Sequence, residues 1–248
     1  MKAVGVIPAR FESTRFPGKP LAKINGKEMI LWVAEGAKQS KLLSDVYVAT
    51  DDERIARIVE KHGFKFVMTD SSLPTGSDRI WAAVKDKDFD IIVNIQGDEP
   101  LVNGALIDSL IQPMLNDSNV QMSTLAHPLS ETELNSENSV KVILNKNSEA
   151  IYFSRFAIPF SREKFNPQKA SGQVLKHIGM YGYKKTFLKQ YCESGPTFVE
   201  NAESLEQLRA LYLGARIKII QTDYRSWGVD VPSDIQIIEQ KLKERLKG

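Results

Sequence analysis

The sequence predicts an α/β fold built on a mostly parallel, doubly wound sheet that carries a β-rich insertion. Two observations favour this class. In the first half of the chain, β-rich runs alternate with segments of helical periodicity, which is typical of parallel βαβ units. In the second half, β-rich runs follow one another with short polar connections, which favours antiparallel pairing. We therefore expect a single domain over residues 1–248 with a β-rich insertion at about 126–183.

Buried runs and helical spacing define the elements of the first half. An apolar strand opens the chain and ends at Pro8. The stretch 90–95 is almost continuously apolar, so we expect a strand in the middle of a parallel sheet. Further strands are expected at 45–50, 64–68 and 120–125, and helices at 29–40, from Asp51 or Asp52 to Gly63, at 79–85 and at 106–115.

The second half begins with a predicted hairpin, because a polar Asn-Lys-Asn-Ser turn joins the β-rich runs 140–144 and 150–153. A strand at 178–183 and a helix at 202–212 that stops at Gly214 are expected next. We also expect a polar loop at 167–172, a strand at 217–222 and a helix at 235–246 with a solvated Lys/Arg-rich face.

Composition excludes several classes of protein. Hydrophobic residues make up 42% and charged residues 26% of the 248, which is ordinary for a globular protein. A net charge of +2 gives no strong attraction to nucleic acid. A lone cysteine, Cys192, excludes an internal disulfide, and with three His it argues against a Cys/His zinc cluster. Neither a bilayer-spanning run nor a signal-type segment is found, so we expect a cytoplasmic protein without membrane insertion.

The loop after the first strand has the composition of an anion cradle. Arg10, Arg15 and Lys19 lie within ten positions, and small residues including Gly18 stand between them. Open α/β sheets bind ligands at the carboxyl ends of their strands, which is where this loop begins. Neither the Gly-Lys-[Ser/Thr] ending of a Walker A loop nor a Gly-x-Gly-x-x-Gly fingerprint is present. The loop therefore predicts a phosphate site of another kind.

Two acidic residues are candidate metal ligands. Asp98 follows the most apolar strand, and Asp230 lies between a predicted strand and the last helix. Hard cations such as Mg²⁺ prefer carboxylate and phosphate oxygens. A turn or helix cap is the alternative for Asp98, and a helix N-cap region is the alternative for Asp230.

Three further segments carry polar side chains with both a structural and a functional interpretation. Thr75-Gly76-Ser77-Asp78-Arg79 is either a capped helix start or a base-recognition loop in which Arg79 bonds a carbonyl. His177 and Tyr181 lie on one strand face, where packing is the alternative to ligand binding. Glu206 and Gln207 lie beside helical leucines, where a solvated helix face is the alternative.

Taken together, these segments resemble the cytidylyltransferases that activate acidic sugars. The resemblance begins with VIPAR at 6–10 and STRFPGKPL at 13–21. The more specific matches are VNIQGDEP at 93–100, YFSR at 152–155, KHIGMYGY at 176–183 and SLEQLR at 204–209. Their order covers nearly the whole chain and is most similar to the members that act on 3-deoxy-manno-octulosonate (Kdo). The resemblance implies a Rossmann-like nucleotide-diphospho-sugar transferase fold.

The family resemblance also implies an activity: CMP passes from CTP to Kdo with Mg²⁺ as cofactor, giving CMP-Kdo and pyrophosphate for lipopolysaccharide biosynthesis, in a homodimer. Its implied catalytic residues are Arg10, Lys19 and Asp98. CTP would be bound by Pro8, Ala9, Arg10, Arg15, Lys19, Thr75, Gly76, Ser77 and Arg79. The sugar would be bound by Arg10, Gln96, Arg155, His177, Tyr181, Glu206 and Gln207, and the metal by Asp98 and Asp230.

The sequence departs from the common family pattern in the base-recognition loop and on the sugar side. Residues 196–202 and Trp227 are unusual, and Ser77-Asp78 stands where Thr-Glu is frequent. An 8-amino Kdo analogue or another acidic sugar therefore stays an alternative acceptor. A non-catalytic nucleotide-binding module is a third hypothesis, but it predicts a broken metal site, and both Asp98 and Asp230 are present.

Overall fold

The computed structural model describes residues 1–13, 15–162 and 172–245. The described chain forms two compact units. The first contains Met1–Asp108 and the chain from Ser226 onward, and the second contains Ser109–Arg225. Helix α4 (Gly104–Asn116) begins in the first unit and ends in the second. The prediction of one domain with an insertion at about 126–183 stays a prediction beside this division.

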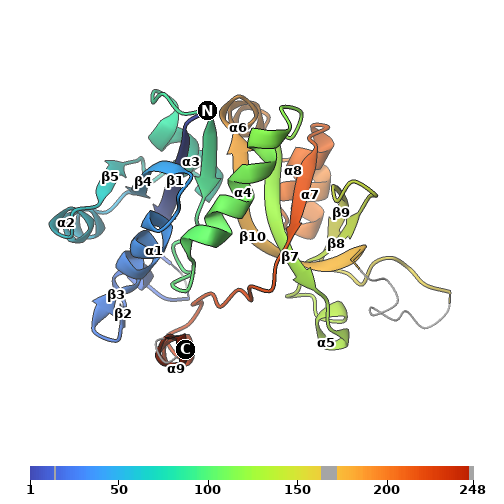
Figure 1. Ribbon diagram of the computed structural model, residues 1–248. Coiled ribbons are helices and arrows are strands. Elements are labelled where there is room, and N and C mark those ends of the chain that lie inside the picture. Colours follow the sequence, from blue (N-terminus) through green and yellow to red (C-terminus); the bar gives the residue numbers. More distant parts are fainter. Residues whose placement is uncertain (14, 163–171, 246–248) are drawn as a thin grey trace. The chain divides into compact units, whose positions relative to one another are not determined.

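The first unit is built on parallel strands in the order β6-β1-β4-β5 (Figure 1). Strand β1 pairs on both edges, and Val4, Val6 and Ile7 are fully buried. The first strand runs one residue beyond Pro8, the predicted end. The bounds are β1 (Ala3–Ala9), β4 (Leu43–Thr50), β5 (Lys65–Met68) and β6 (Ile91–Asn94). The predicted α/β class with a mostly parallel sheet is confirmed.

Capping residues and a left-handed glycine mark the ends of helices in the first unit. Asp52 caps α2 by accepting a hydrogen bond from Arg54 N, and Gly63 follows that helix with φ of 75°. Helix α3 begins three residues before the prediction because Thr75 and Asp78 form a reciprocal capping box. The bounds are α1 (Met29–Lys38), α2 (Glu53–Lys61), α3 (Gly76–Val84) and α9 (Asp234–Arg245).

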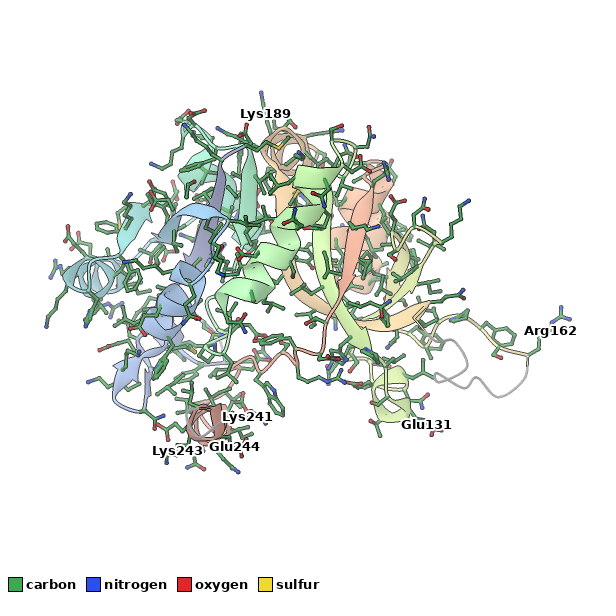
Figure 2. All side chains as sticks on the ribbon, in the orientation of Figure 1. Glu131, Arg162, Lys189, Lys241, Lys243 and Glu244 are labelled. Carbon is green, nitrogen blue, oxygen red and sulfur yellow. The ribbon has the colours of Figure 1, made fainter. Side chains whose placement is uncertain are left out.

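Short elements complete the first unit. A 3₁₀ turn (η1, Lys19–Leu21) leads into the small hairpin of β2 (Lys23–Ile24) and β3 (Lys27–Glu28). Glu239 of α9 accepts a hydrogen bond from Asn25 N at 2.7 Å, which fixes the last helix to this hairpin. Figure 2 shows charged side chains, among them Lys243 and Glu244, projecting from α9. The predicted solvated face of this helix is confirmed at these exposed positions.

The second unit pairs its strands in the order β11-β7-β10-β8-β9 (Figure 1). Strands β7 and β11 are parallel, whereas β10 is antiparallel to both β7 and β8. Strands β8 and β9 form the predicted antiparallel hairpin. The bounds are β7 (Met122–Pro128), β8 (Lys141–Leu144), β9 (Ala150–Ser154), β10 (Val174–Lys184) and β11 (Ile217–Gln221).

The predicted single helix at 202–212 is wrong. The structure has two helices there, and Ser204 between them has a left-handed φ of 51°. The break is stabilised from β9, because Glu203 accepts hydrogen bonds from Ser154 Oγ at 2.7 Å and Arg155 N at 2.9 Å. Such tertiary bonds outweigh helix propensity. The helices of the second unit are α5 (Glu131–Leu134), α6 (Lys185–Glu193), α7 (Phe198–Glu203) and α8 (Gln207–Tyr212).

Two further expectations concern a polar loop and membrane-spanning segments. The polar loop predicted at 167–172 lies almost wholly outside the described residues. Among the helices that are described, none has both the length and the apolar character needed to cross a lipid bilayer.

Candidate active site

A cavity of about 810 Å³ opens in the first unit beside the loop that follows β1. Phe11 is stacked under the guanidinium of Arg54, 3.3 Å from the ring centroid, and its carbonyl accepts a hydrogen bond from Gly18 N at 2.8 Å. Gly18 has φ of 71°, a conformation that glycine adopts without strain. The lining residues are Arg10, Phe11, Glu12, Ser13, Pro17, Asp51, Asp52, Arg54 and Ser71. The predicted anion loop therefore borders a cavity large enough for a nucleotide.

Lys19 contacts one predicted metal ligand, Asp98, and the residue before the other, Asp230. Its Nζ donates to Asp98 Oδ2 at 2.7 Å and to the carbonyl oxygen of Val229 at 3.0 Å. Val229 N in turn donates to the carbonyl oxygen of Asp98 at 3.0 Å. Asp230, the next residue, accepts a hydrogen bond from Arg15 at 2.8 Å. Two carboxylates and two cations that are distant in sequence are thus brought together within the first unit.

This group of residues is suited to a hard divalent cation bound together with phosphate. No group of three or more His, Cys, Asp and Glu side chains that could hold a metal ion is found in the described part of the chain. Mg²⁺ commonly takes one or two carboxylates and completes its octahedron with substrate phosphates and water. Asp98 and Asp230 fit that donor set, and Arg15 and Lys19 add the positive charge that a triphosphate requires.

The predicted base-recognition loop forms the start of α3, and buried side chains fix it to neighbouring parts of the chain. Ser77 and Arg79 are fully buried. Arg79 donates to Asp51 Oδ2 at 2.7 Å and to Thr69 Oγ1 at 2.5 Å, while its Nε has no hydrogen-bond partner in the described structure. Burial lowers the pKa of Arg79, although Asp51 opposes the shift. The capped-helix interpretation is therefore confirmed by the capping box of Thr75 and Asp78, and base recognition by this loop stays a prediction.

Pro8 and Ala9 lie at the carboxyl end of β1, where the turn after β6 approaches closely. A Cβ at Gly97 would come within 2.8 Å of the Pro8 carbonyl oxygen, so glycine is required there. Gly76 packs loosely on Pro8, since its Cβ would lie at an ordinary 3.7 Å. Gln96, predicted to bind sugar, belongs to this unit, and its carbonyl oxygen accepts from Glu99 N at 3.2 Å.

Apart from Arg10, which is in the first unit, the remaining predicted sugar residues belong to the second unit, where β10 brings His177 and Tyr181 together. Their ring centroids are 5.5 Å apart. The register with β7 shifts between Ile178 and Tyr181. His177 and Tyr181 are four positions apart, a spacing that places side chains on one face of a strand. His177 lies 2.9 Å from Thr124 Oγ1, and burial lowers the pKa of His177 to about 3. His177 is therefore a neutral ring at pH 7.

Gln207 at the start of α8 completes this group. It is 2% exposed, and its Oε1 accepts a hydrogen bond from the hydroxyl of Tyr181 at 3.2 Å. Burial raises the pKa of Tyr181, so this hydroxyl keeps its proton. The Nε2 of Gln207 has no hydrogen-bond partner in the described structure. A buried donor without a partner is costly, and sugar binding by Gln207 stays a prediction.

Arg155 has a structural role in the described chain. Its guanidinium donates to the carbonyl oxygens of Glu203 at 2.9 Å, Glu137 at 3.2 Å and Ser204 at 3.3 Å. These bonds hold the corner between α7 and α8, directly before Glu206 and Gln207. The prediction that Arg155 contacts the sugar stays a prediction, and its visible bonds are to the backbone.

Sequence reasoning missed the residues that support the site from behind. Tyr191 donates to the carbonyl oxygen of Glu206 at 3.0 Å and lies 4.5 Å from the guanidinium of Arg209. Arg209 forms a buried ion pair with Glu200 at 2.5 Å. The Thr-Phe-Val-Glu pattern at 197–200 is a capping-box signal that would have placed α7. No local sequence pattern indicates the roles of Tyr191 and Arg209.

A sequence model described as cytidylyltransferase matches residues 4–219. The chain belongs to the cytidylyltransferase family. A relative from Bdellovibrio bacteriovorus, named 3-deoxy-manno-octulosonate cytidylyltransferase, is 58% identical over 245 residues, which are 99% of each chain. A cytidylyltransferase of the same name from Geotalea uraniireducens is 46% identical over 98% of this chain and 100% of its own.

A solved cytidylyltransferase structure supports the same placement within the family. It is described as CMP:2-keto-3-deoxy-manno-octonic acid synthetase complexed with CTP, and it is 37% identical in sequence. The TM-score is 0.92, with 99% of this chain and 100% of the other covered. The family model over residues 4–219 and the relatives and solved structure over 99% of the chain therefore agree on the family and the fold.

Proposed function

We propose that this cytidylyltransferase transfers CMP from CTP to the anomeric hydroxyl of Kdo and releases pyrophosphate. The observation that carries the proposal is the 58% identity, over 99% of both chains, to a protein named for this activity. The site supports it, because one unit gathers cations and carboxylates and the other has buried neutral donors. An 8-amino Kdo analogue is the second candidate acceptor, favoured by the unusual sequence at 196–202.

The first unit would bind and orient the triphosphate. In the reaction, the sugar C2 hydroxyl oxygen bonds to the α-phosphorus, the bond from that phosphorus to pyrophosphate breaks, and the hydroxyl proton passes to solvent. Arg10, Arg15 and Lys19 would offset the charge that gathers on the phosphate oxygens. We propose that Asp98 and Asp230 hold Mg²⁺. When bound, Mg²⁺ would supply charge neutralisation and make the attacking hydroxyl more acidic.

The second unit would recognise the sugar acid. Gln207 offers Nε2 as a donor, and Tyr181 keeps that amide in place through its Oε1. His177, with a pKa of about 3, would act as a neutral hydrogen-bonding group and not as a counter-ion or as a base at pH 7. Recognition by buried neutral donors selects hydroxyl and carbonyl patterns, because an unmatched donor costs free energy.

The decisive experiment measures pyrophosphate release with CTP, UTP, ATP and GTP against Kdo, its 8-amino analogue and a nonulosonic acid, each with and without Mg²⁺. Release that requires CTP, Kdo and Mg²⁺ together is expected. Release with the 8-amino analogue but not with Kdo would transfer the proposal to the second candidate. No release with any acceptor would leave the non-catalytic nucleotide-binding module as the better account.

We further propose that the protein acts as a homodimer in the cytoplasm, where cells make CTP. The dimer is supported by the side chains that the second unit exposes. The most exposed aromatic side chains among the described residues all belong to it: Phe156 at 73%, Phe160 at 89%, Phe198 at 85% and Tyr212 at 73%. Exposed aromatic groups of this kind are typical of protein interfaces.

A further inference from the structure

The segment 226–230 carries a proposed metal ligand but has no secondary structure of its own. It lies between Arg225, where the second unit ends, and the turn before α9. Its backbone belongs to neither a helix nor a sheet ladder, and at its last residue Asp230 N donates to Asp234 Oδ2 of α9 at 2.8 Å. The place of Asp230 therefore depends on the contacts that other parts of the first unit make with these residues.

Glu99 makes two of those contacts at the start of the segment. Its carboxylate accepts a hydrogen bond from Ser226 Oγ and one from Trp227 N, the latter at 3.2 Å. Glu99 is 6% exposed, although glutamate is rarely buried without a reason. The preceding residue, Asp98, holds the far side through its carbonyl oxygen, which Val229 N reaches at 3.0 Å. Consecutive residues of one turn thus hold the segment at its start and at Val229, the residue before Asp230.

The contact requires a side chain with two acceptor oxygens. Ser226 approaches Oε1 and Trp227 N approaches Oε2, so each oxygen receives one donor. The segment also passes closely, since a Cβ at Gly228 would lie 3.5 Å from Oε1. Glutamine would keep one acceptor and turn an NH₂ group toward the other donor. Hydrogen bonds to an ionised acceptor are also stronger than those to a neutral amide.

We propose that Glu99 is a positioning residue for the divalent-cation site. It keeps the segment 226–230 in the place that sets Asp230 beside Asp98. The inference rests on the proposed function of Asp98 and Asp230 as metal ligands. Residues that orient metal ligands without touching the metal typically change metal affinity 10- to 100-fold when they are replaced.

The test is a Mn²⁺ titration of the full chain with CTP present and sugar acid absent, so that no turnover occurs. Electron paramagnetic resonance reports free Mn²⁺, and a titration of CTP alone supplies the background. Glu99→Gln is expected to weaken Mn²⁺ binding about 10-fold. Ser226→Ala, which removes one donor and leaves the turn intact, is expected to weaken it less, and it keeps the test available if Glu99→Gln folds poorly.

Asp108→Asn is the matched control. Asp108 also uses a carboxylate to hold a loop of the first unit, accepting from Ser40 Oγ at 2.5 Å and from Leu42 N at 3.0 Å. That loop lies before β4, at the amino end of the parallel strands, whereas Asp98 follows the carboxyl end of β6. Wild-type Mn²⁺ affinity is expected for this variant.

Hydrogen exchange of the peptide that covers 226–230 supplies a second readout. Faster exchange together with weaker Mn²⁺ binding in Glu99→Gln is the expected result. Unchanged Mn²⁺ affinity in Glu99→Gln, where Asp230→Asn does weaken binding, would overturn the positioning role and leave the metal site standing. Unchanged affinity in Asp230→Asn would overturn both the metal pair and the role of Glu99. If the wild type releases no pyrophosphate with Kdo but binds Mn²⁺ as expected, the proposed acceptor is contradicted and the role of Glu99 is not.

Discussion

The cations and carboxylates proposed for the nucleotide and metal site of the first unit form two pairs. Lys19 and Asp98 are partly buried at 17% and 32% exposure, whereas Arg15 and Asp230 are exposed at 68% and 53%. Exposed pairs contribute about 0–1 kcal/mol, so the bond between Arg15 and Asp230 is readily exchanged. The cations and carboxylates that would meet a metal–triphosphate complex therefore also pair with one another.

Asp98→Asn tests this group at the level of one atom. Asparagine keeps the shape of the side chain and removes the charge that would hold the proposed Mg²⁺ and that pairs with Lys19. Turnover is expected to fall at least ~100-fold, comparable with the loss of one strong electrostatic stabiliser. Steady-state pyrophosphate release at saturating substrates measures it. Asp88→Asn, which alters an exposed pair with Lys2, is the control and should keep wild-type turnover. Near-normal turnover in Asp98→Asn would remove this residue from the mechanism.

His177 predicts a pH dependence of stability. Burial lowers the pKa of His177 to about 3 in the folded chain, whereas an unfolded histidine has a pKa of about 6.5. Below pH 6.5 the unfolded state binds the proton first, so the free energy of unfolding falls as the pH falls from about 6.5 toward 3. Urea unfolding across this range measures the slope. His177→Gln is expected to flatten it, and an unchanged slope would show that His177 is not buried as a neutral ring.

At the scale of elements, α7 and α8 are held by an ion pair that excludes water. Glu200 and Arg209 are 10% and 5% exposed, and Arg209 also donates to the carbonyl oxygen of Tyr191 at 3.3 Å. Tyr191 in turn bonds the carbonyl oxygen of Glu206. This chain of contacts connects the interior of α7 with the residue before Gln207. The orientation of the proposed sugar donors thus depends on the packing of two short helices.

Glu200→Gln is expected to destabilise the protein by about 3 kcal/mol, because it leaves the buried Arg209 without its counter-ion. Glu53→Gln breaks a pair with Arg57 in which both side chains are at least 75% exposed. That control should change stability by no more than about 0.5 kcal/mol. Chemical denaturation of both variants at pH 7 makes the comparison, and equal effects would contradict the importance of burial for this pair.

The elements also show which parts of the fold can be predicted from the sequence. Apolar strands such as 90–95 and the helix stop at Gly63 were predicted because their signals are local. The break at Ser204 was not, since it depends on Glu203 reaching Arg155, which is 48 positions away. Glu99 was missed for the same reason: its partner Ser226 is 127 positions away. Local pattern finds candidate ligands, and long-range hydrogen bonds decide which residues position them.

For the whole molecule, the exposed aromatic side chains of the second unit predict a homodimer. Light scattering coupled to size exclusion is expected to give twice the chain mass for the wild type. Replacing Phe156 and Phe198 together with Asp should give the monomer, because charge opposes burial in an interface. Met68→Asp, at an exposed apolar position of the first unit, is the control and should stay dimeric. A monomeric wild type at working concentration would refute the dimer.

The first unit is discontinuous, and this has a consequence for synthesis of the chain. Asp98 is made early, while Asp230 and its supporting segment follow only after the whole of the second unit. At about 5–20 residues per second, the ribosome needs on the order of ten seconds to pass from one to the other. During that time Glu99 is present without Ser226 and Trp227, the donors that it holds in the folded chain. The ribosome thus supplies the last residues of the proposed cation site only near the end of synthesis.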